Sequence, residues 1–295
     1  MAAWSEGYWS SSDGLRLHFR DYPGDLSRPP IVCIPGLTRN ARDFEGVAER
    51  LAGRWRVICV DLRGRGQSEH AKDPMSYVPA RYAEDIEALF AEHGLSRAIL
   101  FGTSLGGIVT MLLAQRDASR IAGAVINDIG PVLEARGLDK IRGYVGRSLN
   151  WPTWLHAARA IAEAQGDRYP DYKIEHWIAY AKRLCKLTPN GRVVFDYDMR
   201  IAEPFKVPGG EAGFDMWEAW RGLATVPTLL LRGELSDLLS EETERRMKAE
   251  VPALETVTVP RVGHAPTLDE PDAADAIEAF LARLAAAALK RRVPG

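Results

Sequence analysis

The sequence contains few cysteines: three among 295 residues, at Cys33, Cys59 and Cys185. An odd number cannot pair fully within one chain, and none of the three has the spacing of a metal-binding motif. Cys33 and Cys59 lie inside apolar segments that are typical of buried strands. The sequence therefore predicts buried, reduced thiols in a cytoplasmic protein rather than a disulfide-stabilised secreted one.

The sequence also lacks an excess of either charge and a long apolar run. It has 38 Lys and Arg against 40 Asp and Glu, a net charge of -2. This balance argues against nucleic acid or an anionic membrane as a partner, and no apolar run is long enough to span a membrane. The first residues lack the basic and apolar segments of a signal peptide. We therefore expect a monomer or homodimer that acts on a small-molecule substrate, with no nucleic-acid or membrane partner.

No motif for a cofactor is present. Gly64 and Gly66 are separated by one residue, but the third glycine and the strand-turn-helix context of a dinucleotide site are missing. His, Cys, Asp and Glu residues do not occur at metal-ligand spacing. We therefore expect a protein that needs no metal and no organic cofactor.

What the sequence does contain is a regular alternation of strand-like and helix-like segments. The strand-like segments are apolar throughout, which is typical of a parallel sheet buried on both faces. An Asp-Gly turn predicts an antiparallel hairpin over residues 9–20. These features predict an α/β fold with a mostly parallel central sheet and helices on both faces. The later strands are expected at residues 29–34, 55–60, 97–101, 121–126, 226–233 and 254–260, and the helices at 43–51, 79–93, from 105 and 272–289.

The alternation stops in the middle of the chain. From about residue 132 to 222 the sequence is rich in aromatic residues, has helical spacing and lacks a convincing apolar strand. After residue 222 the strand pattern resumes. We interpret residues 132–222 as a helical insertion into a core formed by residues 1–131 and 223–295.

The most informative motif is Gly-Thr-Ser-Leu-Gly at residues 102–106, between an expected strand and an expected helix. In this context Gly-x-Ser-x-Gly is typical of a nucleophile elbow, a tight turn that exposes the hydroxyl of Ser104. Gly102 and Gly106 remove side chains that would collide with the neighbouring strand and helix. The backbone N–H of Leu105 then lies at a helix N-terminus, where the helix dipole favours a developing oxyanion.

A serine nucleophile needs a general base, and the base needs a carboxylate. His264 lies in a loop bounded by glycine and proline after the last expected strand. Asp237 lies in the loop after the preceding strand, so the order Ser104, Asp237, His264 matches that of α/β hydrolases. Asp128, at the end of the strand after the elbow, is an alternative acid or a hinge residue, and Glu234 is a weaker third candidate.

With these residues, the chain resembles the α/β-hydrolase superfamily over almost its whole length. The matching motifs are Pro-Gly-Leu at residues 35–37, Asp-Leu-Arg-Gly-Arg-Gly-Gln-Ser at 61–68, the elbow, the loop around Asp237, and Gly-His at 263–264. The resemblance implies a nucleophile at Ser104, a base at His264 and an acid at Asp237. It also implies an α/β-hydrolase fold whose inserted helical cap (residues 132–222) covers the site.

The same resemblance implies an oxyanion hole formed by the backbone N–H groups of Leu37 and Leu105. Many relatives have His-Gly where this chain has Pro35 and Gly36. Because backbone amides form the hole, we expect this difference to have little effect on the mechanism.

The residues expected to contact substrate are less clearly marked. Arg39, just after the Pro-Gly-Leu motif, is a candidate ligand for a substrate carboxylate, and its alternative is a solvated helix start. Three aromatic residues of the insertion either line an apolar pocket or hold short helices together. They are Trp151, Trp154 and Trp177.

Three classes of function follow. The first is a serine hydrolase that cleaves a carboxylic ester, thioester or lactone of a small to medium, partly apolar substrate through an acyl-enzyme. The second keeps the triad but hydrolyses a carbon–carbon bond in a ring-cleavage-type diketone. The third is a cofactor-free haloperoxidase or perhydrolase, or a ligand receptor without turnover.

Overall fold

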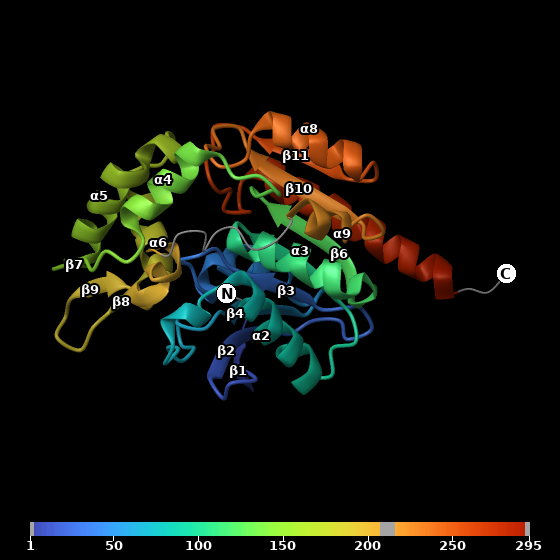
Figure 1. Ribbon diagram of the computed structural model, residues 1–295, viewed down its shortest axis with the longest axis horizontal. Coiled ribbons are helices and arrows are strands. Elements are labelled where there is room, and N and C mark those ends of the chain that lie inside the picture. The colour runs from blue at the N-terminus through green and yellow to red at the C-terminus, as the bar shows by residue number, and fades with distance from the viewer. Residues whose placement is uncertain (1–2, 207–215, 293–295) are drawn as a thin grey trace.

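The computed structural model describes residues 3–206 and 216–292. For residues 289–292 it describes the backbone but not the side chains. Its centre is an eight-stranded sheet in the order β1-β2-β4-β3-β5-β6-β10-β11 (Figure 1). The first two strands form the predicted antiparallel hairpin, β2 is antiparallel to β4, and the other neighbours are parallel, so the predicted α/β fold is confirmed. The strands are β1 (Ser5–Ser10), β2 (Arg16–Tyr22), β3 (Ile31–Ile34), β4 (Val57–Asp61), β5 (Ala98–Thr103), β6 (Ile121–Asn127), β10 (Thr228–Gly233) and β11 (Glu255–Val259).

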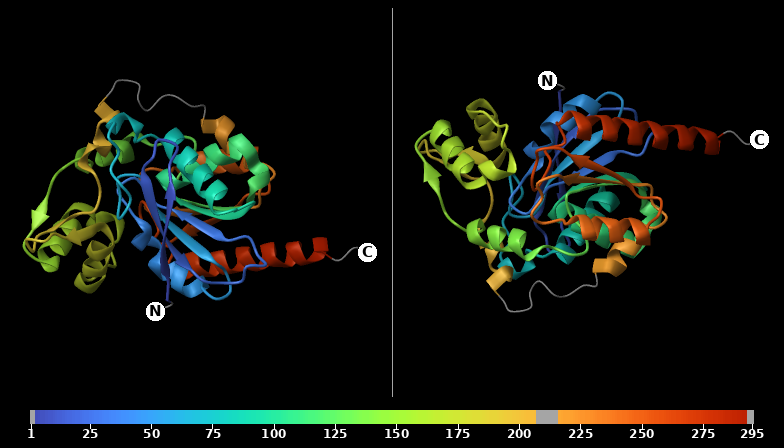
Figure 2. Two further views of the ribbon diagram at one scale, coloured as in Figure 1. Left: turned by 90° about the horizontal axis from the view of Figure 1, so that it is seen from below. Right: turned by 90° about the horizontal axis from the view of Figure 1, so that it is seen from above.

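Helices cover both faces of this sheet (Figure 2). Successive residues of a strand point to opposite faces. In β3, Ile31 and Cys33 pack with α1 and α9, whereas Val32 and Ile34 pack with α2 and α3. This explains why the strands are apolar throughout. Cys33 and Cys59 are buried and unpaired as predicted, and Cys185 is also buried and unpaired. The helices are α1 (Glu45–Leu51) and α9 (Pro271–Arg292) on one face, and α2 (Pro79–Glu92), α3 (Leu105–Asp117), α7 (Met216–Arg221) and α8 (Glu241–Glu250) on the other.

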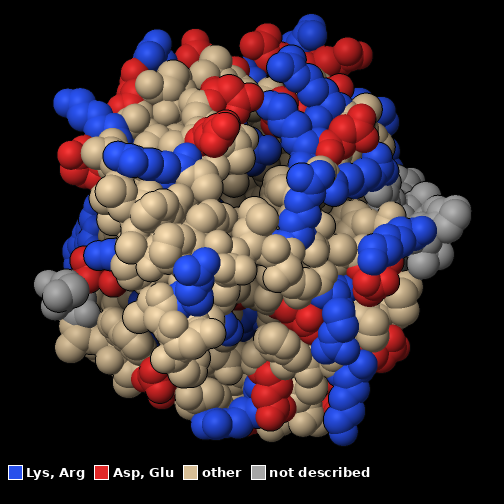
Figure 3. Space-filling view, turned by 90° about the vertical axis from the view of Figure 1, so that its left-hand side faces the viewer, with Lys and Arg blue, Asp and Glu red and all other residues tan. Residues whose placement is uncertain are grey.

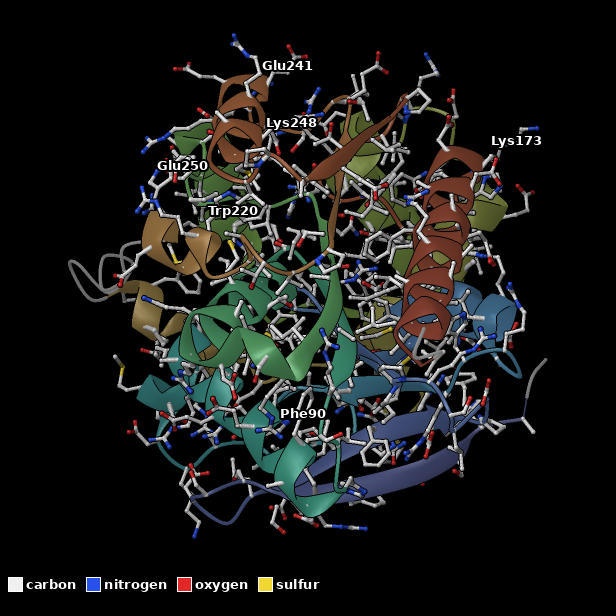
Figure 4. All side chains as sticks on the ribbon, turned by 90° about the vertical axis from the view of Figure 1, so that its right-hand side faces the viewer. Phe90, Lys173, Trp220, Glu241, Lys248 and Glu250 are labelled. Atoms are coloured by element: carbon white, nitrogen blue, oxygen red, sulfur yellow. The ribbon has the colours of Figure 1, made fainter. Side chains whose placement is uncertain are left out.

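Helix α7 packs against the core although it falls within the range expected for the insertion. Trp220 is fully buried, and its indole Nε1 donates a hydrogen bond of 3.1 Å to the carbonyl of Met247 in α8. Figure 4 shows Trp220 close to the helix that carries Lys248 and Glu250. The domain boundary at residue 222 stays a prediction. Residues 207–215 of the expected insertion (132–222) lie outside the described residues.

The segment between β6 and α7 forms a separate group of elements beside the core, on the left in Figure 1. It contains α4 (Ala135–Tyr144), α5 (Trp154–Gln165) and α6 (Ile174–Leu184). From here on, the name cap is used for residues 132–206 alone, the part of the expected insertion that precedes α7. The sequence of this segment shows no convincing apolar strand, but the structure contains short strands there. A small sheet in the order β7-β9-β8 is present, and its two- and three-residue strands are too short to produce a periodic pattern. These strands are β7 (Asn150–Trp151), β8 (Cys185–Leu187) and β9 (Val193–Phe195).

Among the helices that the structure describes, none combines the length and apolarity needed to cross a membrane.

Candidate active site

Ser104 occupies a strained turn between β5 and α3. Its backbone has φ 51° and ψ -115°, a conformation that non-glycine residues rarely adopt. A Cβ atom at Gly106 would lie 1.9 Å from the carbonyl oxygen of Ile34, and one at Gly102 would lie 2.4 Å from the carbonyl oxygen of Gly106. Both glycines are therefore required, as the sequence predicted, because backbone atoms fill the space of a side chain.

The imidazole of His264 lies between the hydroxyl of Ser104 and a carboxylate. Its Nε2 is 2.9 Å from Ser104 Oγ, and its Nδ1 is 2.8 Å from Oδ2 of Asp128. The His264 side chain is 9% exposed and that of Asp128 is fully buried. The arrangement can move a proton from the hydroxyl to the imidazole while the carboxylate supports the resulting positive charge.

Asp128 follows β6, the sheet neighbour of the strand that precedes Ser104. Its Oδ1 accepts a hydrogen bond of 2.8 Å from the backbone N–H of Gly233, and its Oδ2 accepts one of 2.8 Å from the hydroxyl of Ser236. These donors satisfy a buried carboxylate and fix its orientation toward His264.

The prediction that Asp237 is the partner of His264 is contradicted by this geometry. Oδ2 of Asp237 lies 2.7 Å from Nζ of Lys140 in α4. In the loop after β10 it is the preceding residue, Ser236, whose side chain reaches Asp128. Glu234 also has another partner, because its carboxylate accepts a hydrogen bond of 2.7 Å from the backbone N–H of Arg261.

The loop that contains Leu37 is held in place by a buried arginine. Nε and Nη2 of Arg65 donate hydrogen bonds of 2.9 and 2.8 Å to the carbonyl oxygen of Leu37. Arg65 is fully buried, and Leu37 lies on the wall of the cavity next to Ser104. Leu105 is the first residue of α3. The oxyanion hole formed by Leu37 and Leu105 stays a prediction.

A cavity of about 410 Å³ lies over Ser104 and His264, between the core and the cap. Its volume is that of a site for a small or medium ligand. Figure 3 shows the face of the molecule that carries the cap. The centre of this face consists mostly of residues that are neither acidic nor basic. Among the described residues no group of three or more His, Cys, Asp and Glu side chains could hold a metal ion. Aromatic side chains on the cavity wall are those of Tyr144, Trp151, Tyr169, Tyr180, Phe195 and Tyr197, together with Phe44.

Arg39 lines this cavity but already has a carboxylate partner. Its guanidinium forms a bidentate ion pair with Asp43, with Nε 2.9 Å from Oδ2, and lies 4.4 Å from the ring centre of Tyr180. Burial lowers the pKa of Arg39, but Asp43 and the nearby tyrosines raise it well above its usual value overall. A substrate carboxylate would have to compete with Asp43, so the expected clamp at Arg39 is disfavoured.

Of the three tryptophans expected to contact substrate, Trp151 lines the cavity. Trp154 and Trp177 do not line it, and for these two residues the structure favours the alternative that they hold helices together. Trp177 is 4% exposed and its ring packs edge-on against Tyr169 and Tyr172. Aromatic spacing on a helix cannot distinguish such packing from ligand contact.

Sequence reasoning missed several cap residues on the cavity wall, above all Lys140, Tyr144 and Arg168. They belong to no motif. Nothing in their spacing could have marked them, because only the docking of the cap on the core brings them over Ser104.

The family of the chain follows from sequence comparison. The profile of the Alpha/beta hydrolase family matches residues 31–276, which include Ser104, Asp128 and His264. The chain belongs to the α/β hydrolase family.

Two curated proteins are similar to this chain over most of their length. It is 35% identical over 258 residues to a 3-hydroxybutyrate-oligomer hydrolase of Cupriavidus necator, covering 84% of this chain and 87% of that protein. It is 28% identical over 241 residues to a 2-(acetamidomethylene)succinate hydrolase of Mesorhizobium japonicum, covering 81% of this chain and 82% of that protein.

Solved structures agree with this assignment. The crystal structure of an α/β hydrolase from Novosphingobium aromaticivorans superposes with a TM-score of 0.92 at 57% identity, covering 96% of this chain and 99% of that one. The structure of an E-2-(acetamidomethylene)succinate hydrolase superposes with a TM-score of 0.81 at 25% identity, covering 95% and 100% of the two chains.

Proposed function

We propose that this α/β hydrolase cleaves a carboxylic ester of a short, partly apolar substrate through Ser104, His264 and Asp128. The observation that carries the proposal is the position of the His264 imidazole. It lies within hydrogen-bond distance of both the hydroxyl of Ser104, whose backbone is strained, and the buried carboxylate of Asp128. The similarity to a 3-hydroxybutyrate-oligomer hydrolase supports an ester as the bond that is cleaved.

In the first half of the reaction, Nε2 of His264 accepts the proton of Ser104 as the hydroxyl oxygen attacks the ester carbonyl carbon. Asp128 stabilises the imidazolium and holds its tautomer. The backbone N–H groups of Leu37 and Leu105 stabilise the negative oxygen of the tetrahedral intermediate. The imidazolium then protonates the departing alcohol, which leaves an acyl group on Ser104.

In the second half, a water molecule gives a proton to His264 and attacks the acyl-enzyme carbonyl. Collapse of the second tetrahedral intermediate returns the proton to Ser104 Oγ and releases the carboxylic acid. Every proton in this scheme passes through His264, which explains why its two nitrogens need fixed partners.

The decisive test is the Ser104→Ala variant assayed on p-nitrophenyl acetate and p-nitrophenyl butyrate. We expect kcat/KM to fall at least about 1,000-fold, because members of a triad act as a unit. Ser119→Ala removes an exposed serine beyond the other end of α3 and should keep wild-type activity. Wild-type turnover by Ser104→Ala would refute the proposal, and fluorophosphonate labelling of Ser104 without turnover of any ester would indicate a receptor.

A second candidate function is the hydrolysis of a bond other than an ester. The 28% identity to the 2-(acetamidomethylene)succinate hydrolase supports this candidate. For the carbon–carbon alternative, a carboxylate ligand at Arg39 would be a supporting feature, but Arg39 is paired with Asp43. Comparing kcat/KM for an ester and for a ring-cleavage diketone separates the two functions.

A further inference from the structure

The cap places a buried arginine over the candidate active site. Arg168, at the end of the 3-10 turn Gly166–Arg168 between α5 and α6, is 8% exposed and lines the cavity with Ser104 and His264. Its backbone carbonyl accepts a hydrogen bond of 2.7 Å from the N–H of Gly263. Nη1 of its guanidinium is 3.4 Å from the carbonyl oxygen of His264. The loop that carries His264 thus fixes the position of Arg168.

The guanidinium of Arg168 is incompletely satisfied. Its Nε is buried and has no hydrogen-bond partner, and within residues 3–206 and 216–292 no carboxylate forms an ion pair with it. Asp167 and Asp237 act on its charge from beyond ion-pair distance. An arginine side chain keeps its charge in a protein, and burying a charge without a partner is unfavourable. A partner that enters the cavity would remove this penalty.

Two other cavity-lining cations differ from Arg168 in this respect. Arg39 is paired with Asp43. Nζ of Lys140 lies 2.7 Å from the carboxylates of both Asp167 and Asp237. Asp43 is the one carboxylate among the described residues of the cavity wall, against four Lys and Arg residues. Among the described residues of the wall, Arg168 is therefore the buried cation that has no carboxylate at ion-pair distance.

A neutral hydrogen-bond donor lies beside this cation. Tyr144 lies close enough to the Arg168 guanidinium for its phenol to feel the positive charge, and both side chains line the cavity. Burial raises the pKa of Tyr144, so the phenol stays protonated and can donate a hydrogen bond at neutral pH. A planar guanidinium next to a hydroxyl donor suits a carboxylate, which accepts hydrogen bonds through both oxygens.

We propose that Arg168 binds a carboxylate group of the substrate, so that the enzyme selects esters that carry a free carboxylate a few bonds from the ester carbonyl. This inference rests on the proposed esterase function and adds the charge of the substrate to it. The carboxylate pairs with the Arg168 guanidinium where this side chain lines the cavity, and the adjacent His264 loop keeps the ester carbonyl within reach of Ser104. A neutral ester leaves Arg168 buried and unpaired and is a poorer substrate.

The test compares 3-acetoxybutyrate with 3-acetoxybutanamide, which differ in the charge of one group and contain the same acetate ester. Acetate release is followed by NMR, with p-nitrophenyl acetate as a reporter of ester hydrolysis in general. We expect the wild-type enzyme to prefer the carboxylate at least tenfold in kcat/KM. In Arg168→Met the preference should fall to about one, and Arg168→Lys, which keeps the charge without the planar fork, should be intermediate.

Arg159→Met is the matched control, because Arg159 is an exposed cap arginine in α5 that does not line the cavity. It should keep the wild-type preference. If Arg168→Met keeps the preference, or loses activity equally on the charged and the neutral ester, the inference is overturned and Arg168 is structural. The same conclusion follows if the wild-type enzyme hydrolyses p-nitrophenyl acetate without preferring the carboxylate.

A binding measurement separates failure of this inference from failure of the proposed function. Calorimetric titration of the wild-type protein and of Arg168→Met with 3-hydroxybutyrate requires no turnover. Binding that weakens at least about tenfold in Arg168→Met supports the carboxylate site even if no ester is hydrolysed. Equal binding to both proteins, or none to the wild type, overturns it.

Discussion

The carboxylate of Asp128 accepts hydrogen bonds from the hydroxyl of Ser236 and the backbone N–H of Gly233 and lies 2.8 Å from Nδ1 of His264. Asp237, one residue after Ser236, instead contacts Lys140 at the edge of the cap. The two aspartates therefore have different tasks although both follow neighbouring strands of the sheet. Asp128 orients the imidazole, and Asp237 links the core to the cap.

This difference predicts unequal effects of neutralising the two aspartates. Asp128→Asn should lower kcat about 10,000-fold, because an amide cannot hold the imidazole in its reactive tautomer or support its charge. Asp237→Asn should change kcat less than about tenfold. Steady-state kinetics on p-nitrophenyl butyrate measures both values. A greater loss in Asp237→Asn than in Asp128→Asn would restore Asp237 as the acid.

Among the elements, the strand-turn-helix unit around Ser104 is closely constrained by backbone packing. The carbonyl of Ile34 in β3 occupies the space that a side chain at residue 106 would need. The backbone of the first turn of α3 occupies the space that a side chain at residue 102 would need. The turn can therefore present Ser104 in a strained conformation without moving, because three elements hold it from different sides.

Gly106→Ala should accordingly destabilise the protein by about 3 kcal/mol, since the new Cβ meets backbone rather than a flexible side chain. The matched control is Gly143→Ala in α4, where a Cβ meets nothing within 4 Å. This change should leave stability equal or raise it by up to about 1 kcal/mol, because alanine favours a helix. Urea unfolding gives both values. Equal stability of the two variants would show that the elbow can relax around a methyl group.

For the molecule as a whole, a fully buried arginine connects the turn of the N-terminal hairpin to the core, in addition to the pairing of β2 with β4. Arg63 forms ion pairs with Asp13 in the β1–β2 turn, at 2.9 Å, and with Asp85 in α2, at 2.6 Å. Its hydrogen bonds are the main reason why the pKa of Asp13 is lowered from 3.8 to about 2. Asp13 therefore stabilises the folded protein in its charged form.

The stabilising effect of Asp13 should be fully present above about pH 4 and disappear as the pH falls toward 2, because a lowered folded-state pKa favours folding only while the group is ionised. Its side chain is 42% exposed, so we expect no more than about 1 kcal/mol. The measurement is the difference in unfolding free energy between wild type and Asp13→Asn across pH 2–6. Ser12→Ala, a neighbouring uncharged change, should give a pH-independent difference. A pH-independent difference for Asp13→Asn would contradict the prediction.

The sequence alone determined the features that depend on neighbouring residues along the chain. Apolar segments identified the strands of the buried sheet, and glycines identified the strained turn at Ser104. The glycine- and proline-bounded loop identified His264. These signals are local because backbone sterics and the burial of a strand act on residues that are adjacent in sequence.

Only the tertiary structure decided which acid meets His264 and which side chains face the cavity. Asp128 and Asp237 both follow neighbouring strands, and the path of the loop after β10 turns Ser236 rather than Asp237 toward the site. Likewise, the docking of the cap buries Arg168 over Ser104 and directs Trp177 into aromatic packing. These outcomes depend on contacts between segments far apart in sequence, which leave no periodic pattern in either segment.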